Sequence, residues 1–202
     1  VDVERRRAYE RAGLSAVRAM HRMRIDFDAA PAAAAWPEGV ETRAFDPDRD
    51  LKAMCVASEE AFRDHWGRVP WTLDEEERNW VEWMRWQGDA FDPSLSTLAW
   101  EGDVVVGFAL GRPHLPLDRT RGIVASLAVR PAWRRKGLGS ALLRHALGVF
   151  FARGCASAEL LVDSESLTGA LRLYERAGLR AFRTQIVYEK ELRAGRDIVK
   201  RA

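Results

Sequence analysis

The chain has 202 residues, 47% of them hydrophobic, enough for one well-buried domain with roughly fifty residues to spare, since domains cluster near ~100–150 residues. Its 32 basic and 30 acidic residues are interspersed and leave a formal charge of only +2, which supplies little of the positive field that nucleic-acid binding needs. No apolar run approaches the ~18–20 residues of a membrane-spanning helix, and no charged-then-apolar leader opens the sequence. We therefore expect a cytoplasmic protein with neither a nucleic-acid nor a membrane partner.

The first informative pattern is a repeat. The run YERAGL occurs at residues 9–14 and again at 174–179, Ala16 matches Ala181 at the same offset, and both copies then enter alternating stretches. A charged helix that closes on an Ala-Gly C-cap explains part of this likeness, but six identical residues exceed what such a cap demands. We interpret residues 1–28 as the last helix and strand of a preceding copy of the same domain.

An Ala/Pro linker, AAPAAAAWP, occupies residues 29–37 and has the composition of a domain separator. The second domain is predicted over 38–192, followed by a tail over 193–202. It opens with a strand at 40–45 and a helix from Pro47. The apolar side of that helix is formed by Leu51, Met54, Cys55, Ser58, Ala61 and Phe62.

A second helix is predicted over 73–86, with Thr72 as N-cap and Glu75 in the capping-box position. The remaining elements follow from alternation, apolar runs and turn residues. They are strands at 96–100 and 104–111 joined by a turn at 101–103, a strand at 123–129, a helix from Leu138 to Val149, a strand at 158–162, a helix at 168–177 and a final strand or strand pair at 179–192. This order predicts helices over a mixed sheet, an α/β (α+β mixed) fold.

The strongest chemical signal is the segment VRPAWRRKGLGS at residues 129–140, where a strand breaks at Pro131 and enters a helix through a glycine-bearing turn. A helix N-terminus offers unpaired N–H groups and the positive end of the helix dipole. Gly137 and Gly139 let the backbone approach a phosphate, and Arg134, Arg135 and Lys136 add positive charge. The segment therefore predicts an anion-binding turn.

In this arrangement the sequence resembles the GNAT superfamily, because residues 134–139, RRKGLG, fit its R/Q-x-x-G-x-G/A acyl-CoA signature directly after a Leu-Ala-Val strand end. About forty residues on, GALRLYERAGL at 169–179 is similar to the family's second motif, with one spacing step changed and Leu179 in place of Phe. The resemblance covers residues 38–192. It implies a central, mostly antiparallel twisted sheet flanked by helices on both faces.

The resemblance also implies roles for individual residues. The backbone of Leu127, Ala128 and Val129 is expected to pair with the pantetheine arm of acetyl-CoA, and the N–H of Leu127 or Ala128 to stabilise the oxyanion. Tyr174 is expected to donate a proton to the departing thiolate; alternatively, it fills the core. The pyrophosphate would be held by the backbone of Arg135, Lys136, Gly137, Leu138, Gly139 and Ser140.

Two positions depart from the family's pattern. Ala125 stands where many members carry a glutamate as general base, and Leu167 where an asparagine often precedes the last helix. Another group must then accept the amine proton. The sequence gives no reason to rank the candidates, for each of which a solvated surface role is the alternative: Glu59, Glu60, His65, Glu101, His114, Asp118 and, more weakly, Ser126.

Five tryptophans crowd the region between the first two helices of the domain, where the family forms its acceptor pocket. They could line a cavity for an apolar amine or pack in the core: Trp66, Trp71, Trp80, Trp83 and Trp86. The two cysteines, Cys55 and Cys155, lack metal-site spacing and are interpreted as small buried hydrophobes.

The sequence thus predicts an N-acetyltransferase that uses acetyl-CoA and a small-molecule amine and needs no metal. Two alternatives stay open, a non-catalytic acyl-CoA-binding module and a protein N-acetyltransferase. Because an isolated strand edge invites pairing, the N-terminal segment is expected to dock on this domain or on a second copy in a homodimer.

Overall fold

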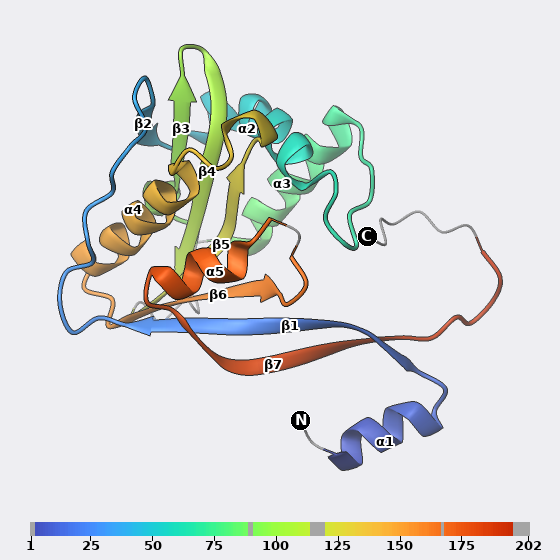
Figure 1. Cartoon of the computed structure of the whole chain (residues 1–202). Coiled ribbons are helices and arrows are strands. Elements are labelled where there is room, and N and C mark those ends of the chain that lie inside the picture. The colour runs from blue at the N-terminus through green and yellow to red at the C-terminus, as the bar shows by residue number, and fades with distance from the viewer. Residues whose placement is uncertain (1–2, 89–90, 114–119, 167, 196–202) are drawn as a thin grey trace.

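The computed structural model describes residues 3–88, 91–113, 120–166 and 168–195. Figure 1 shows a single sheet with helices on both of its faces. The elements in chain order are α1 (Val3–Arg11), β1 (Ser15–Asp26), β2 (Glu41–Ala44), α2 (Pro47–Phe62), α3 (Leu73–Gln87), η2 (Pro93–Leu95), β3 (Thr97–Glu101), β4 (Val104–Pro113), β5 (Arg121–Val129), η3 (Pro131–Trp133), α4 (Leu138–Ala152), β6 (Ser157–Asp163), α5 (Ala170–Arg176) and β7 (Arg180–Glu189).

The sheet has seven strands in the order β2-β3-β4-β5-β6-β1-β7. Every neighbouring pair is antiparallel except β5 and β6, which run parallel. The predicted mixed, mostly antiparallel sheet is therefore confirmed, as are the predicted order and approximate bounds of its strands and helices.

Local sequence chemistry explains where the two helices of one face begin. Asp46 caps α2, its side chain accepting from the N–H of Asp48, and Pro47 occupies the first turn. At α3, Thr72 and Glu75 form the predicted capping box in both directions. The capping box therefore fixes where the segment 63–72, which joins α2 to α3, ends.

Two apolar cores lie on opposite faces of the sheet. One packs α4 and α5 against the sheet around Leu142, Leu147 and Phe150, and the other packs α2 and α3 around Met54, with Phe108 reaching them from β4. Both cysteines are buried, and burial raises the pKa of Cys55 to about 12, which confirms their interpretation as buried hydrophobes. Among the described residues, no helix is long and apolar enough to cross a membrane.

The N-terminal strand lies inside the sheet. β1 pairs with β6 over residues 20–26 and with β7 over residues 15–24, and Met23 at its centre is fully buried in the core shared with α4. Figure 1 shows β1 and β7 as a long ribbon along the lower edge of the molecule, with α1 standing beyond its end.

The β1–β7 ribbon has an internal two-fold relation that matches the sequence repeat. Adding 165 to the number of a β1 residue and subtracting 165 from the number of its β7 partner gives another pair of the same ladder. Ala16↔Tyr188 becomes Met23↔Ala181 in this way, and Met20↔Gln185 becomes itself. The two register shifts, at Val17 and Phe182, are also 165 apart. The helix–strand units α1–β1 and α5–β7 therefore occupy equivalent positions about one pseudo-two-fold axis.

The two units differ in what covers them. Tyr174 of α5 is 8% exposed inside the core, whereas its counterpart Tyr9 of α1 is 40% exposed. Helix α1 has no buried residue; Tyr9 packs on Tyr188 with ring centroids 4.9 Å apart. The α1–β1 unit thus repeats the α5–β7 unit, but α1 does not pack on an apolar core as α5 does.

Deletion of residues 1–28 is expected to abolish cooperative folding of this chain. The deletion removes β1 from between β6 and β7, detaches β7 and uncovers the core at Met23. Loss of the Met23 side chain alone would cost about 2–5 kcal/mol. Circular dichroism with thermal melting would check this. A monomer that melts cooperatively at the temperature of the full chain would contradict it.

Candidate active site

The central strands part where the motif residues begin. The parallel ladder between β5 and β6 runs from Arg121↔Ser157 to Val124↔Leu160. Beyond Val124, β5 stays paired with β4 through Leu127, Ala128 and Val129, while β6 pairs with β1. Among the described residues, no strand pairs with the other side of β5 at residues 125–129, which therefore faces a gap in the sheet.

The direction of the amides along this gap follows from one hydrogen bond. The N–H of Arg130, directly after β5, donates to the carbonyl oxygen of Val106 in β4 at 3.0 Å. Because successive amides of a strand point to opposite sides, the N–H groups of Leu127 and Val129 point away from β4, into the gap. Of the two residues predicted as oxyanion donors, Leu127 is oriented for the role and Ala128 faces β4.

The turn that follows β5 has the backbone of an anion site. Arg135 and Gly137 both have positive φ, 64° and 86°, and Gly137 is the N-cap of α4 with no side-chain cap hydrogen bond. The first amides of α4 are thus left for another acceptor. Arg135 and Lys136 are exposed beside them. This turn can hold a phosphate group by its main chain and neighbouring charge.

Gly139 has a packing reason as well. A Cβ at this position would lie 3.4 Å from Leu173 of α5 and 3.7 Å from Val129 of β5. The glycine therefore lets the first turn of α4 start close to both elements. Leu138 is buried in the core and Ser140 is half-buried, so the motif segment is anchored while its glycine-bearing turn stays accessible.

Arg134 has a structural task that the sequence did not reveal. Its Nε donates to the carbonyl of Val129 at 3.1 Å, and its Nη2 donates to the carbonyl of Ala61 at 2.8 Å. The guanidinium thereby joins the end of β5 to the last turn of α2 across the rim of the gap. No local sequence signal could have shown this contact, since 73 positions separate Arg134 from Ala61.

Tyr174 lies on α5 with its side chain in the core between α5, α4 and the sheet. Burial raises the pKa of Tyr174 to about 12, so the phenol keeps its proton at neutral pH. A protonated phenol is the form that can donate to a thiolate. The structure is thus compatible both with the predicted acid role and with a packing role.

Three of the predicted general-base candidates are engaged elsewhere. Glu59 pairs with Arg63 at 2.7 Å and Glu60 with Arg130 at 2.7 Å, while Glu101 accepts from the indole of Trp133. Ala125 is an exposed residue at an irregularity of the β4–β5 ladder and offers only a methyl group. His114, Asp118 and the departure at Leu167 lie outside the described residues.

The five tryptophans divide into different environments. Trp80 and Trp83 pack edge to face at 5.4 Å, and Trp83 packs in turn on Phe91, so these two serve the packing of α3. Trp86 is 79% exposed and Trp71 is 40% exposed. Trp66 lies under the guanidinium of Arg18 of β1, 5.7 Å from the ring centroid. The described structure therefore does not gather the five rings into one cavity.

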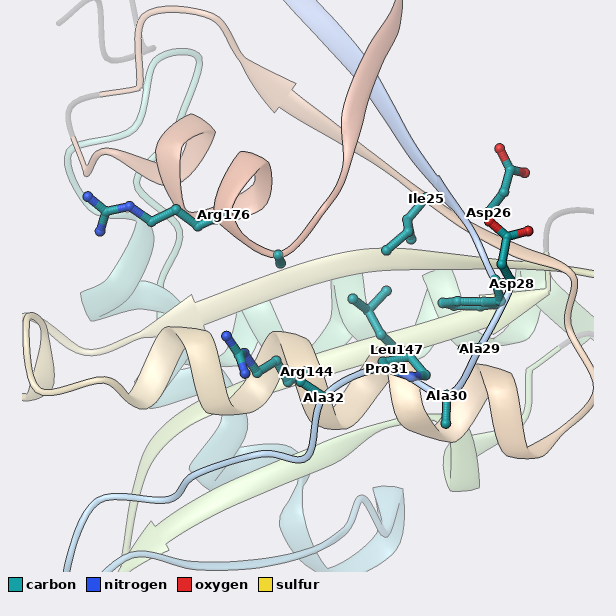
Figure 2. A pocket seen from close by; sticks show the side chains of 12 residues that line it. Ile25, Asp26, Asp28, Ala29, Ala30, Pro31, Ala32, Arg144, Leu147 and Arg176 are labelled. Atoms are coloured by element: carbon teal, nitrogen blue, oxygen red, sulfur yellow. The ribbon is translucent and has the colours of Figure 1, made fainter.

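A separate cavity of about 350 Å³ lies between α4, the end of α5 and the segment that leaves β1. Figure 2 shows Arg144 and Leu147 of α4 below it and Asp26 and Asp28 at its opposite side. None of the motif residues 134–140 lines it. Trp36 of the linker also packs on His145 of α4 at 5.6 Å, so the linker lies against this helix.

The parted strands and the glycine-capped helix start define the acyltransferase class that the motifs predicted. The chain belongs to the GNAT acetyltransferase family, whose family model, described as acetyltransferase (GNAT) family, matches residues 52–179.

Two curated relatives are mycothiol acetyltransferases. The protein of Thermobispora bispora is 33% identical over 181 residues, which cover 88% of this chain and 59% of the relative. That of Streptomyces scabiei is 35% identical over 176 residues, covering 87% and 53%. The chain thus spans little more than half the length of these relatives.

Solved structures agree with the fold. A GCN5-related N-acetyltransferase from Sphaerobacter thermophilus superposes with a TM-score of 0.80 at 38% identity, over 97% of this chain and 58% of that one. A tandem GNAT protein from the clavulanic acid biosynthesis pathway gives a TM-score of 0.73 at 12% identity, over 93% and 58%. The second likeness concerns the fold alone.

Proposed function

We propose that this domain transfers an acetyl group from acetyl-CoA to a primary amine of a small molecule. The observation that carries the proposal is the gap beside β5, into which the N–H groups of Leu127 and Val129 point. The strand then leads into a turn suited to a phosphate. An extended pantetheine arm fits along such an edge as an added strand, with the pyrophosphate at the start of α4.

Two of the described residues supply functions in this reaction. The N–H of Leu127 stabilises the negative charge that develops on the thioester oxygen when the amine attacks. Collapse of the tetrahedral intermediate breaks the C–S bond, and Tyr174 protonates the leaving thiolate. The products are the N-acetyl amine and free CoA.

A small acceptor is supported by two observations. Arg134 ties the last turn of α2 to the end of β5 at the rim of the gap, which narrows the approach from that side. The two curated relatives are also named for mycothiol and not for a protein substrate.

A thiol-release assay tests the proposal. Purified chain and acetyl-CoA are incubated with a panel of small primary amines and, separately, with peptides carrying free N-termini or lysines. Thiol release with a small amine, together with an acetylated product by mass spectrometry, supports the proposal. Turnover of peptides alone favours a protein N-acetyltransferase. Binding of acetyl-CoA without turnover favours the non-catalytic module, for which the methyl group of Ala125 is the motivating observation.

We also propose that α1 and β1 are the last helix and strand of a preceding domain of the same fold. The symmetric register about Met20↔Gln185 and the bare face of α1 support this organisation. In it, the outer edge of β7 would meet the counterpart of β6 in that domain. A second copy of this chain fits less well, because its own β6 is already paired with its own β1.

Hydrogen–deuterium exchange on this chain and on the complete product of its gene tests that organisation. The backbone amides of α1 and of the outer edge of β7 should exchange more slowly in the longer protein than in this chain. A gene product without a second domain, or equal exchange in both proteins, would overturn the proposal.

A further inference from the structure

His65 lies in the loop that follows α2, and its side chain packs on the last residue of that helix. Its ring packs edge to face on Phe62 with centroids 4.9 Å apart, and Phe62 packs on Phe108 at 6.4 Å. Phe108 is the direct partner of Ala128 in the β4–β5 ladder. The rings of Phe62 and Phe108 thus connect the imidazole to the segment of β5 at which the thioester is proposed to lie.

The loop that carries His65, residues 63–72, is positioned from both sides of the gap. On the β5 side, Arg134 holds the carbonyl of Ala61 in the last turn of α2, directly before the loop. On the β6 side, Arg18 of β1 pairs with Asp163 at 2.8 Å and lies over the ring of Trp66. β5 and β6 diverge toward Arg134 and Asp163, and the charges of both residues act on His65. The loop that carries His65 therefore lies near both sides of the opening.

The imidazole is available for proton transfer. Within the described part of the chain, neither ring nitrogen makes a hydrogen bond, and the ring is half-buried. Burial lowers the pKa of His65 below its ordinary value. Arg134 and Arg68 act in the same direction, while Asp163 and Asp64 oppose them. The neutral, proton-accepting form is thereby favoured at neutral pH.

From this placement we infer that His65 is the general base of the proposed transfer, in the role for which Ala125 offers no group. The inference rests on the proposed function. The nitrogen lone pair of the amine attacks the thioester carbon, a ring nitrogen of His65 takes the N–H proton, and the imidazolium releases it to solvent after the C–S bond has broken. Tyr174 supplies the separate proton that the thiolate receives.

A binding experiment tests the placement without any turnover. The Cε1–H resonance of His65, assigned by its absence in His65→Gln, should shift when acetyl-CoA is added to the chain. That of His145, which lies against Trp36 on α4, should shift less. Saturating acetyl-CoA that leaves the His65 resonance unmoved would overturn the inference while leaving the proposed function standing.

The kinetic experiment uses an acceptor amine that stays unprotonated over the pH range tested, so that only enzyme groups titrate. Wild-type kcat/KM should fall as pH drops through the pKa of His65. In His65→Gln it should be about 10²-fold lower at neutral pH and lose that dependence, with unchanged affinity for acetyl-CoA. The matched variant His145→Gln, whose histidine is also half-buried, should keep the wild-type profile.

The outcomes separate the two proposals. If His65→Gln turns over at the wild-type rate with the wild-type pH profile, the role of His65 is overturned and the proposed function stands. Failure of the wild-type chain to bind acetyl-CoA overturns the proposed function and this inference with it.

Discussion

Substitution of Gly137 by glutamate is expected to weaken binding of acetyl-CoA by at least about a hundredfold, or roughly 2.7 kcal/mol. Gly137 caps α4 with a φ of 86°, beside the amides proposed to hold the pyrophosphate. A glutamate there places a negative charge against the phosphates and distorts the backbone that presents the amides, each of which contributes about 1.5–3 kcal/mol toward a charged group. Isothermal titration with acetyl-CoA measures the effect.

Gly154 supplies the matched control at the other end of the same helix. It also has a positive φ, 78°, and a Cβ there meets nothing within 4 Å, as at Gly137. The backbone penalty, about 1–2 kcal/mol for a side chain in this conformation, is therefore shared by Gly154→Glu and Gly137→Glu. Equal affinities of both variants and wild type for acetyl-CoA would refute the proposed phosphate site. Equal losses would trace the effect to backbone strain.

Replacement of Tyr174 by phenylalanine is expected to lower kcat about 10²-fold while leaving the affinity for acetyl-CoA unchanged. The phenol is protonated at neutral pH because burial raises its pKa to about 12, and loss of a positioned acid typically costs 10²–10⁴-fold in rate. Steady-state thiol release with a small amine gives kcat. Titration gives the affinity.

The repeat provides the control for this variant too. Tyr9 occupies the position of Tyr174 in the α1–β1 unit, but it is 40% exposed and packs on Tyr188. Tyr9→Phe should therefore leave kcat unchanged. If Tyr174→Phe also turns over at the wild-type rate, the phenol is a core residue and another group protonates the thiolate.

The elements of the fold could be predicted because their signals are local. The capping box at Thr72 and the apolar side of α2 each depend on residues close together in the sequence, and the structure confirms both. The main-chain turn around Gly137 was equally visible, since only a glycine adopts its backbone without strain.

The contacts that shape the gap could not be predicted, because they join distant segments. Arg134 was expected to face a phosphate, yet its side chain holds Val129 and Ala61. The pair of Arg18 with Asp163 spans 145 positions, and the choice of Leu127 over Ala128 depends on how β5 pairs with β4. The ranking of His65 above the other candidates likewise required knowing which carboxylates were already paired.

The place of β1 between β6 and β7 also sets an order of events during synthesis. Residues 15–26 are made before the rest of this sheet, but their partners at 157–163 and 180–189 follow only after β2 to β5 have been made. Strand β1 must therefore wait for these partners until β6 has been made. Such long-range closure makes for slow folding and prolonged exposure to aggregation, so a nascent chain of this protein is a natural client for chaperones.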